Sequence, residues 1–289
     1  MLRAVIVGFG NIGHAVLETL LASADFEAAG VVSRSLAAGA LGDIPVVRDI
    51  EALPKPDVAI LCSPSRAVPD LAASLLEKGI CTVDSYDIHS SIYEVRQRLD
   101  AVAKAHSAAA VMSAGWDPGT DSMVRALLEA MAPKGITYTN FGPGMSMGHT
   151  VAVKAIPGVK NALSMTIPLG TSIHRRMVYI ELKDGYNFDE VAAKIKADAY
   201  FASDETHVIQ VDSVADVLDM GHGVNLTRKG VSGKTPNQLF EFNMKINNPA
   251  LTGQVLVAVK QDPGAYTMIE IPVIDLLEGN KENIIRHLV

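Results

Sequence analysis

The chain has 289 residues and a formal net charge of −7, with 48% hydrophobic and 20% charged residues. This length suits about two domains with a large core. The balance of residues excludes a disordered chain or a coiled coil. The acidic balance argues against a nucleic-acid partner, because binding a phosphate backbone needs a face of Lys and Arg. No run approaches the roughly 18 apolar residues that span a bilayer.

The first part of the chain alternates short apolar runs with segments of helical spacing. A β-branched run at 3–8 stops at glycine, and helix-type spacing follows at 14–23. Strands are then expected at 26–34, 57–65 and 80–87, helices at 68–79 and 91–106, and a further apolar run lies at 108–116. Such alternation is typical of a parallel sheet covered by helices on both faces. We therefore expect a doubly wound α/β domain over 1–118.

After Pro118 the sequence changes character and predicts a second domain over 119–263. Glycine-rich and methionine-rich turns are expected at 141–149, and alternating strands at 175–182 and 207–214. These features indicate an α+β domain with an antiparallel sheet. A helix is expected at 249–260, and 267–277 has strand and helix character, so residues from about 264 to 289 are expected to pack back on the first domain.

The fingerprint G-x-G-x-x-G is present as Gly8-Phe9-Gly10-Asn11-Ile12-Gly13, after a strand and at the start of a helix. In this context Gly8 permits a tight turn, Gly10 lets the backbone approach a pyrophosphate, and Gly13 allows close packing. The helix N-terminus, including Asn11 and Ile12, then offers amide groups to the phosphates. The alternative is a simple turn between a strand and a helix.

The residues after the second strand indicate which dinucleotide is bound. An enzyme that uses NAD usually has an acidic side chain there for the ribose 2′-hydroxyl. This chain instead has Ser33-Arg34-Ser35, which suits the 2′-phosphate of NADP through charge-assisted hydrogen bonds. We therefore expect NADP as cofactor, although a single arginine leaves open an ordinary surface role or the use of both cofactors.

The cysteines and histidines predict no disulfide and no metal. Cys62 and Cys81 both lie in apolar runs, where a thiol packs as a small hydrophobe, so we expect a reducing cytoplasm. The opening of the chain is apolar over only about five residues, which is too short for a signal peptide. The eight histidines are scattered, with no C-x-x-C or H-E-x-x-H motif.

Five stretches read together resemble the meso-diaminopimelate dehydrogenase family, and the likeness runs over nearly the whole chain. They are VDSYDIH (83–89), SAGWDPGTDS (113–122), FGPGMSMGH (141–149), KAIPGVKNALSMTIP (154–168) and NNPAL (247–251). The chain looks like the compact branch of the family, which is more tolerant of other 2-keto acids. The resemblance implies reversible, NADP-dependent oxidative deamination of the D-centre of meso-2,6-diaminopimelate to L-2-amino-6-oxopimelate and ammonia, in lysine biosynthesis, by a homodimer or larger assembly.

The same resemblance implies roles for particular residues. Asp84 and Asp117 would hold the reacting amino group, and either of them would handle its proton. Trp116 would form an apolar wall, and Phe141 stands beside a position where many relatives carry tryptophan. The remaining substrate contacts would come from polar and small residues of the second domain: Ser146, Met147, Gly148, Thr166, Arg175, His222 and Asn248. Without the resemblance, the two aspartates read as turn or cap residues and Arg175 as an exposed strand charge.

Further cofactor contacts are expected at the ends of two later strands, at Cys62, Ser63, Pro64 and Ser65 and again at Asp84, Ser85 and Tyr86. Two other functions stay open from the residues alone. The first is another NADPH-dependent amino-acid dehydrogenase or a reductase of the dihydrodipicolinate type, although the histidine-rich motif of that reductase is absent. The second is a non-catalytic NADP-sensing protein, which would have no need for the acidic and basic residues named above.

Overall fold

The computed structural model describes residues 1–218, 222–257, 262–277 and 280–288. The chain divides into two compact units, which are described separately. The first unit comprises Met1–Val124 and Pro249–Val289, and the second unit comprises Arg125–Asn248. Among the described residues, every helix is too short or too polar to cross a membrane.

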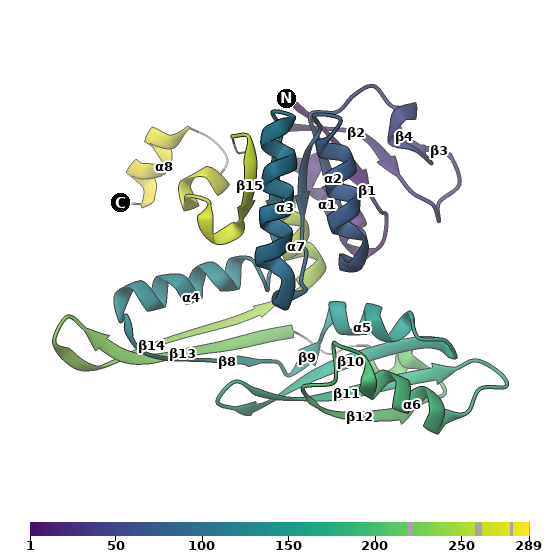
Figure 1. The fold of residues 1–289 in the computed structure, drawn as a ribbon, viewed down its shortest axis with the longest axis vertical. Coiled ribbons are helices and arrows are strands. Elements are labelled where there is room, and N and C mark those ends of the chain that lie inside the picture. Colours follow the sequence, from purple (N-terminus) through teal and green to yellow (C-terminus); the bar gives the residue numbers. More distant parts are fainter. Residues whose placement is uncertain (219–221, 258–261, 278–279, 289) are drawn as a thin grey trace. The chain divides into compact units, whose positions relative to one another are not determined.

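The described residues of the first unit form an eight-stranded sheet (Figure 1) in the order β15-β7-β6-β5-β1-β2-β4-β3. All neighbouring strands run parallel except β3, which pairs antiparallel with β4. The strands are β1 (Leu2–Val7), β2 (Phe26–Val32), β3 (Gly39–Leu41), β4 (Ile44–Val47), β5 (Val58–Leu61), β6 (Cys81–Asp84), β7 (Ala109–Met112) and β15 (Gly264–Thr267).

Helices cover both faces of this sheet because its strands are apolar on both sides. Along β1, Val5 and Val7 pack with α2 (Val68–Leu76) and α3 (Ile92–Ala105), whereas Ala4 and Ile6 pack with α1 (Asn11–Ala22) and α7 (Asn248–Val257). Successive side chains of a strand point to opposite faces, so a continuous apolar run builds two cores. This is the doubly wound arrangement that the sequence predicts.

The end of the chain completes the first unit. β15 pairs in parallel with β7, and the backbone N–H of Ala265 donates to Asp100 Oδ1 at 3.0 Å. The strand and helix character expected at 267–277 is wrong for most of that segment. After Thr267 the chain forms two 3₁₀ turns, η5 (Met268–Glu270) and η6 (Val273–Leu276), and then α8 (Lys281–Leu288). Pro272, which has no N–H, separates the two turns.

The second unit contains two sheets, in the orders β12-β11-β10-β9 and β14-β13-β8. Helix α4 (Thr120–Met131) links the two units, and α5 (Met147–Lys154) and α6 (Phe188–Ala197) pack on one face of the β10–β11 pair. The strands are β8 (Lys134–Phe141), β9 (Gly144–Met145), β10 (Val159–Gly170), β11 (Ile173–Leu182), β12 (Glu205–Gln210), β13 (His222–Ser232) and β14 (Thr235–Ile246).

Three details of the second unit differ from the sequence expectation. The sheet that contains β11 is mixed, because the connection through α6 brings β12 back parallel to β11. The segment 141–149 contains β9 and the start of α5 rather than turns alone. The strand expected at 207–214 ends at Gln210, and η4 (Val214–Val217) begins where Ser213 caps the Ala215 N–H. The predicted α/β fold with a second α+β unit is confirmed.

Candidate functional site

The glycine fingerprint forms a turn that only glycine can make at two of its positions. Gly8 has φ +99°, and a Cβ there would lie 2.6 Å from the Cys62 carbonyl oxygen; a Cβ on Gly13 would lie 2.4 Å from the Gly8 carbonyl oxygen. Gly10, the N-cap of α1, has no atom within 4 Å of the position of a Cβ. The backbone beside Gly10 therefore borders open space at the positive end of a helix, as a pyrophosphate site requires.

The loop after β2 places Ser33, Arg34 and Ser35 together. The hydroxyls of Ser33 and Ser35 lie 3.2 Å apart, and Ser33 Oγ accepts the Leu36 N–H at 3.1 Å. A second arginine, Arg48, comes from the end of neighbouring β4 and donates to the carbonyl oxygens of Ser33, at 3.0 Å, and of Arg34. The sequence analysis missed Arg48, because only the β2–β4 pairing brings it here.

The segment after β5 lies beside the glycine turn. The Cys62 N–H donates to the Val7 carbonyl at 2.8 Å, and Ser63 Oγ donates to the same carbonyl at 3.3 Å. Ser65 starts η2 (Ser65–Ala67), with Pro64 as its N-cap. Burial raises the pKa of the Cys62 thiol to about 12, so this cysteine is an inert packing group at neutral pH.

Asp84, the last residue of β6, is completely buried. Its Oδ1 accepts backbone N–H groups of Tyr86 at 2.9 Å and Ser113 at 3.2 Å, while Oδ2 has no hydrogen-bond partner among the described residues. Burial raises the pKa of Asp84 to about 7, against the lowering effect of those two hydrogen bonds. Asp84 is thus a carboxyl group that changes protonation near neutral pH.

The GWDPG loop follows β7, the strand next to β6 in the sheet. It turns tightly, since a Cβ on Gly119 would lie 1.9 Å from the Gly115 carbonyl oxygen. Trp116 is 5% exposed, and the Asp117 side chain lies 3.7 Å from His89 Nε2 through its Oδ2. Asp84 and Asp117 therefore both lie at the carboxyl ends of adjacent parallel strands, where open α/β sheets bind ligands.

In the second unit, Ser146 and Thr166 lie on neighbouring segments. Thr166 pairs with Gly144 of β9, and the Ser146 N–H donates to the Ser164 carbonyl at 2.8 Å. Met147 and Gly148 open α5, with Ser146 as N-cap. These four predicted residues therefore share one end of the sheet.

The arginine that joins this group is Arg176, not the predicted Arg175. Thr166 lies directly opposite Arg176 in the β10–β11 ladder, and the Arg176 guanidinium contacts Thr166 Oγ1 and pairs with Asp204 at 2.6 Å. Arg175 points to the opposite face and pairs with Glu205 at 2.9 Å. The period of two along a strand separates adjacent arginines in this way, but sequence alone does not say which face carries Thr166.

Phe141 and His222 lie in the β8–β13–β14 sheet. Phe141 pairs with Val224, two residues beyond His222, and the Phe141 N–H donates to His174 Nε2 at 2.8 Å. His222 is 8% exposed and is the first residue of β13. Asn248 is the last residue of the second unit and the first of α7.

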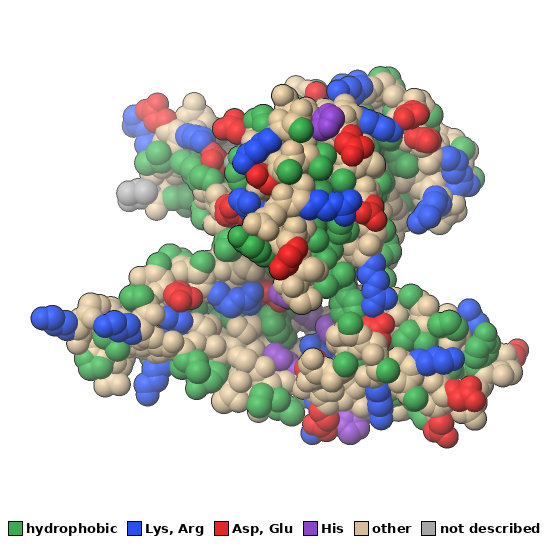
Figure 2. All heavy atoms as spheres, in the orientation of Figure 1, with side chains coloured by type: hydrophobic (Ala, Val, Ile, Leu, Met, Phe, Trp, Pro, Cys, Tyr) green, Lys and Arg blue, Asp and Glu red, His purple; other side chains and the backbone are tan. Residues whose placement is uncertain are grey.

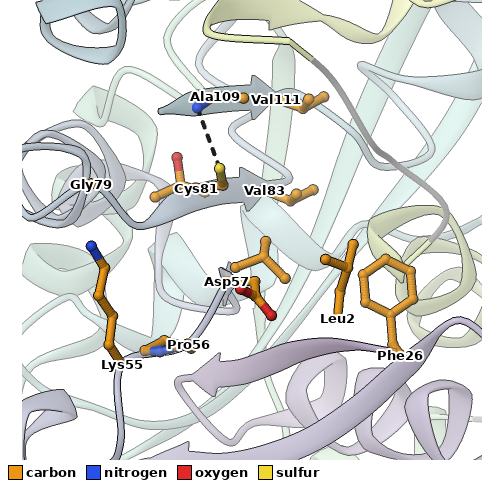
Figure 3. Close-up of a pocket in the computed structure, with 12 residues that line it drawn as sticks. Leu2, Phe26, Lys55, Pro56, Asp57, Gly79, Cys81, Val83, Ala109 and Val111 are labelled. Carbon is orange, nitrogen blue, oxygen red and sulfur yellow. Dashed lines mark hydrogen bonds between the residues drawn. The ribbon is translucent and has the colours of Figure 1, made fainter. Parts of the chain in front are cut away.

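A cavity of about 490 Å³ lies at the other end of the first unit's sheet (Figure 3). It is lined by the first residues of five parallel strands, namely Leu2, Phe26, Val58, Cys81 and Ala109. The predicted residues of the first unit follow the carboxyl ends of the strands instead, so this cavity is separate from them. In the part of the chain that the structure describes, no group of three His, Cys, Asp or Glu side chains suits a metal ion.

Lys and Arg lie among Asp and Glu over most of the face drawn in Figure 2, and blue side chains outnumber red ones at the left end of its lower part. The described residues of this face form no continuous basic stripe. A basic stripe is the electrostatic footprint of a nucleic-acid-binding surface.

The first unit defines the class of protein. Residues 2–113 match the oxidoreductase family with an NAD-binding Rossmann fold, and residues 115–175 match the diaminopimelic acid dehydrogenase C-terminal domain. With the glycine turn at the start of α1 and two aspartates at the carboxyl edge of the same sheet, the chain is a dinucleotide-dependent oxidoreductase.

The relatives narrow this class to one family. The chain is 68% identical to a meso-diaminopimelate D-dehydrogenase of Bacteroides fragilis, over 99% of both chains. A structure of the C. glutamicum DAP dehydrogenase in complex with DAP superposes with a TM-score of 0.88 at 28% identity, covering 100% of this chain and 99% of that one. An engineered D-amino acid dehydrogenase bound to NADP⁺ gives 0.90 at 26% identity, with the same coverage. The chain belongs to the meso-diaminopimelate D-dehydrogenase family, which confirms the resemblance.

Proposed function

We propose that the chain oxidises the D-centre of meso-2,6-diaminopimelate with NADP⁺ and water, giving L-2-amino-6-oxopimelate, ammonium, NADPH and a proton. The reaction is reversible, and its reductive direction makes the amino acid for lysine biosynthesis. The observation that carries the proposal is the pair Asp84 and Asp117 at the carboxyl ends of adjacent strands, in the same unit as the glycine turn. The names of the relatives agree with this chemistry.

Two features of the first unit support NADP as the cofactor, one for the pyrophosphate and one for the ribose 2′-phosphate. The open space at Gly10 suits the pyrophosphate, and the helix N-terminus of α1 carries no acidic side chain in its first turn. Exposed Arg34, with the hydroxyls of Ser33 and Ser35, suits the ribose 2′-phosphate. Arg48 holds the backbone of that loop. When bound, NADP⁺ supplies the acceptor for the hydride that leaves the α-carbon.

The two aspartates have separate tasks because their surroundings differ. The substrate amine must lose a proton before its lone pair can form the C=N bond, and a nearby carboxylate promotes this. We assign Asp84 to hold the amino group and Asp117, whose side chain is 13% exposed and faces His89, to accept the proton. Water then adds to the imine carbon, and ammonia leaves. Trp116 forms an apolar wall that limits access of other water.

The second unit supplies recognition of the substrate's distal end. We assign the carboxylate there to Arg176 and Thr166, because these two groups are in contact and Arg176 is largely buried. Ser146, Met147, Gly148, Phe141, His222 and Asn248 remain the other proposed substrate contacts. Arg175, held by Glu205 on the other face, has a structural role in this assignment.

A stoichiometric assay tests the proposed reaction. Purified protein incubated with NADP⁺ and meso-diaminopimelate is expected to release one ammonium for each NADPH formed. Arg176→Ala is expected to raise the KM for the substrate at least about tenfold, since a charge-assisted bidentate contact is lost. Arg175→Ala serves as the matched control and is expected to keep the KM within about twofold. NADPH formation without ammonium would contradict the proposal.

The family resemblance also leads us to propose a homodimer built through the second unit. Its three-stranded sheet carries exposed apolar side chains in one row, Ile136 at 52% and Leu239 at 58%, which both pair with Lys229. Light scattering is expected to give twice the mass of one chain, and Ile136→Asp to reduce it. A monomer at micromolar concentration would contradict the proposal.

A further inference from the structure

We infer that His149 is a positioning residue that fixes the direction of the Ser146 hydroxyl, so that Ser146 accepts a hydrogen bond from an ammonium group of the ligand. The inference rests on the proposed function, and it deepens it by assigning how the second unit recognises an amino group. His149 is the last residue of the stretch FGPGMSMGH, and neither the resemblance nor the proposed mechanism gives it a role.

The backbone of Ser146 is held on both sides. Its N–H donates to the Ser164 carbonyl at 2.8 Å, and its carbonyl accepts from the Thr150 hydroxyl at 2.6 Å and from the Thr150 N–H at 3.0 Å. The Thr150 hydroxyl in turn accepts the Ser164 N–H at 3.0 Å. With its backbone held in this way, Ser146 can still rotate its side chain and its hydroxyl proton.

His149 removes that freedom. Its Nδ1 lies 2.7 Å from Ser146 Oγ, and its ring is packed edge-on against Tyr200 and Phe201, with centroids 5.3 and 5.2 Å apart. The His149 ring also forms a hydrogen bond with the backbone of Tyr200, and this bond raises the pKa of His149. A bond with that effect is a ring N–H that donates to a carbonyl oxygen. The contact with Ser146 alone leaves donor and acceptor open, and we assign the ring proton to Nε2, because Nδ1 faces Ser146 and a backbone group of Tyr200 favours a ring N–H.

His149 is neutral at every pH of interest, because burial and the nearby Arg176 cation lower its pKa to about 3. A neutral imidazole protonated on Nε2 has only a lone pair on Nδ1. The Ser146 hydroxyl therefore donates its single proton to His149 and keeps only lone pairs for a ligand.

A hydroxyl with only lone pairs to offer distinguishes two kinds of ligand group. It attracts an ammonium N–H and repels a carboxylate oxygen, which itself only accepts. Thr166 and Arg176 stand on the adjacent strands, and Arg176 offers donors to a carboxylate. Ser146 and Arg176 are thus complementary to the two charges of one α-amino acid group.

The test compares two substrates that differ only at the distal amine. Meso-diaminopimelate carries this amine, and D-2-aminopimelate lacks it. The quantity compared is kcat/KM for meso-diaminopimelate divided by kcat/KM for D-2-aminopimelate. In His149→Phe, which keeps the aromatic packing, this ratio is expected to fall at least about tenfold, because one charge-assisted hydrogen bond to the distal amine is lost. In Ser146→Ala the same ratio is expected to fall by a similar factor. In the double variant it is expected to fall no further than in either single variant. His207→Gln, at an exposed histidine of the same unit, is the control and is expected to keep the ratio.

An unchanged ratio in His149→Phe alongside a reduced one in Ser146→Ala would overturn the inference, as would full additivity in the double variant. A second measurement is independent of turnover. Two-dimensional ¹H–¹⁵N spectra of the histidine rings are expected to show His149, assigned by its loss in His149→Phe, as the neutral Nε2–H form from pH 5 to 9. A ring protonated on Nδ1 would refute the inference, whereas absence of turnover with both substrates would refute the proposed function alone.

Discussion

Asp84 illustrates how one buried side chain sets a pH dependence. Its folded-state pKa of about 7 lies above the ordinary value of 3.8, so the folded protein holds a proton that the unfolded chain releases. The stabilising contribution is complete below pH 3.8 and is lost as the pH rises through 7. Relative to Asp84→Asn, wild-type protein is expected to lose about 1.4 kcal/mol of unfolding free energy per pH unit in that window. Urea unfolding at pH 5, 6, 7 and 8 measures this, and parallel curves for the two proteins would show that Asp84 has an ordinary pKa.

Arg34 and Arg48 are expected to act differently on cofactor choice. Arg34→Ala removes the proposed partner of the 2′-phosphate, so the KM for NADP is expected to rise tenfold or more while the KM for NAD stays the same. Arg48→Ala loosens the loop that Arg48 holds by two carbonyl contacts, and a smaller rise for NADP alone is expected. Arg286→Ala, on α8, is the control. Equal effects on both cofactors would contradict the 2′-phosphate assignment.

For single residues, the sequence predicts location where a motif ties the residue to the end of a strand. It does not predict location where the residue is brought into place by the pairing of distant strands. The glycine turn, Asp84 and the GWDPG loop lie at strand ends, as their motifs predict. The roles of Arg48 and His149 depend on the β2–β4 pairing and on packing against Tyr200 and Phe201, which the sequence around each residue does not reveal. Choosing between Arg175 and Arg176 requires the register of β10 against β11.

In the strand–turn–helix element at the start of the chain, one glycine is expected to matter for folding and another for binding of the cofactor. A Cβ on Gly13 would overlap the Gly8 carbonyl oxygen, whereas a Cβ on Gly10 meets nothing within 4 Å. Gly13→Ala is therefore expected to lower the melting temperature, and Gly10→Ala to fold like wild type but bind NADP at least about tenfold more weakly. Thermal unfolding and calorimetric titration with NADP measure the two effects. Normal NADP binding by Gly10→Ala would place the pyrophosphate elsewhere.

Elements of the first unit were largely predictable, and those of the second were not. Strands β1, β2, β5 and β6 are short apolar runs bounded by turns, and α2 and α3 have a clear helical period. The long strands β10 and β14 pair with distant segments and were missed, although Phe240, Phe242, Met244 and Ile246 alternate with polar side chains along β14. The parallel β11–β12 pair depends on the crossover through α6.

For the whole molecule, the segment that follows β15 is part of the first unit's core. Ile271 is 3% exposed and packs in the cluster that contains α1 and α7, whereas Ile269 is 56% exposed. Ile271→Ala is expected to cost about 2 to 4 kcal/mol of unfolding free energy, and Ile269→Ala less than about 0.5 kcal/mol. Urea unfolding of both variants tests this matched pair. If Ile271→Ala lost as little unfolding free energy as Ile269→Ala, the segment after β15 would contribute little to the core.

The proposed activity is oxidation of the D-centre of meso-diaminopimelate with NADP⁺ as the preferred cofactor. The most direct measurement follows absorbance of the reduced cofactor after purified protein is mixed with NADP⁺ and either meso- or LL-diaminopimelate, with NAD⁺ in parallel. We expect NADPH formation with the meso isomer, none with the LL isomer, and a much slower reaction with NAD⁺. Oxidation of the LL isomer, or no oxidation of the meso isomer by protein that binds NADP⁺, would contradict the proposed activity.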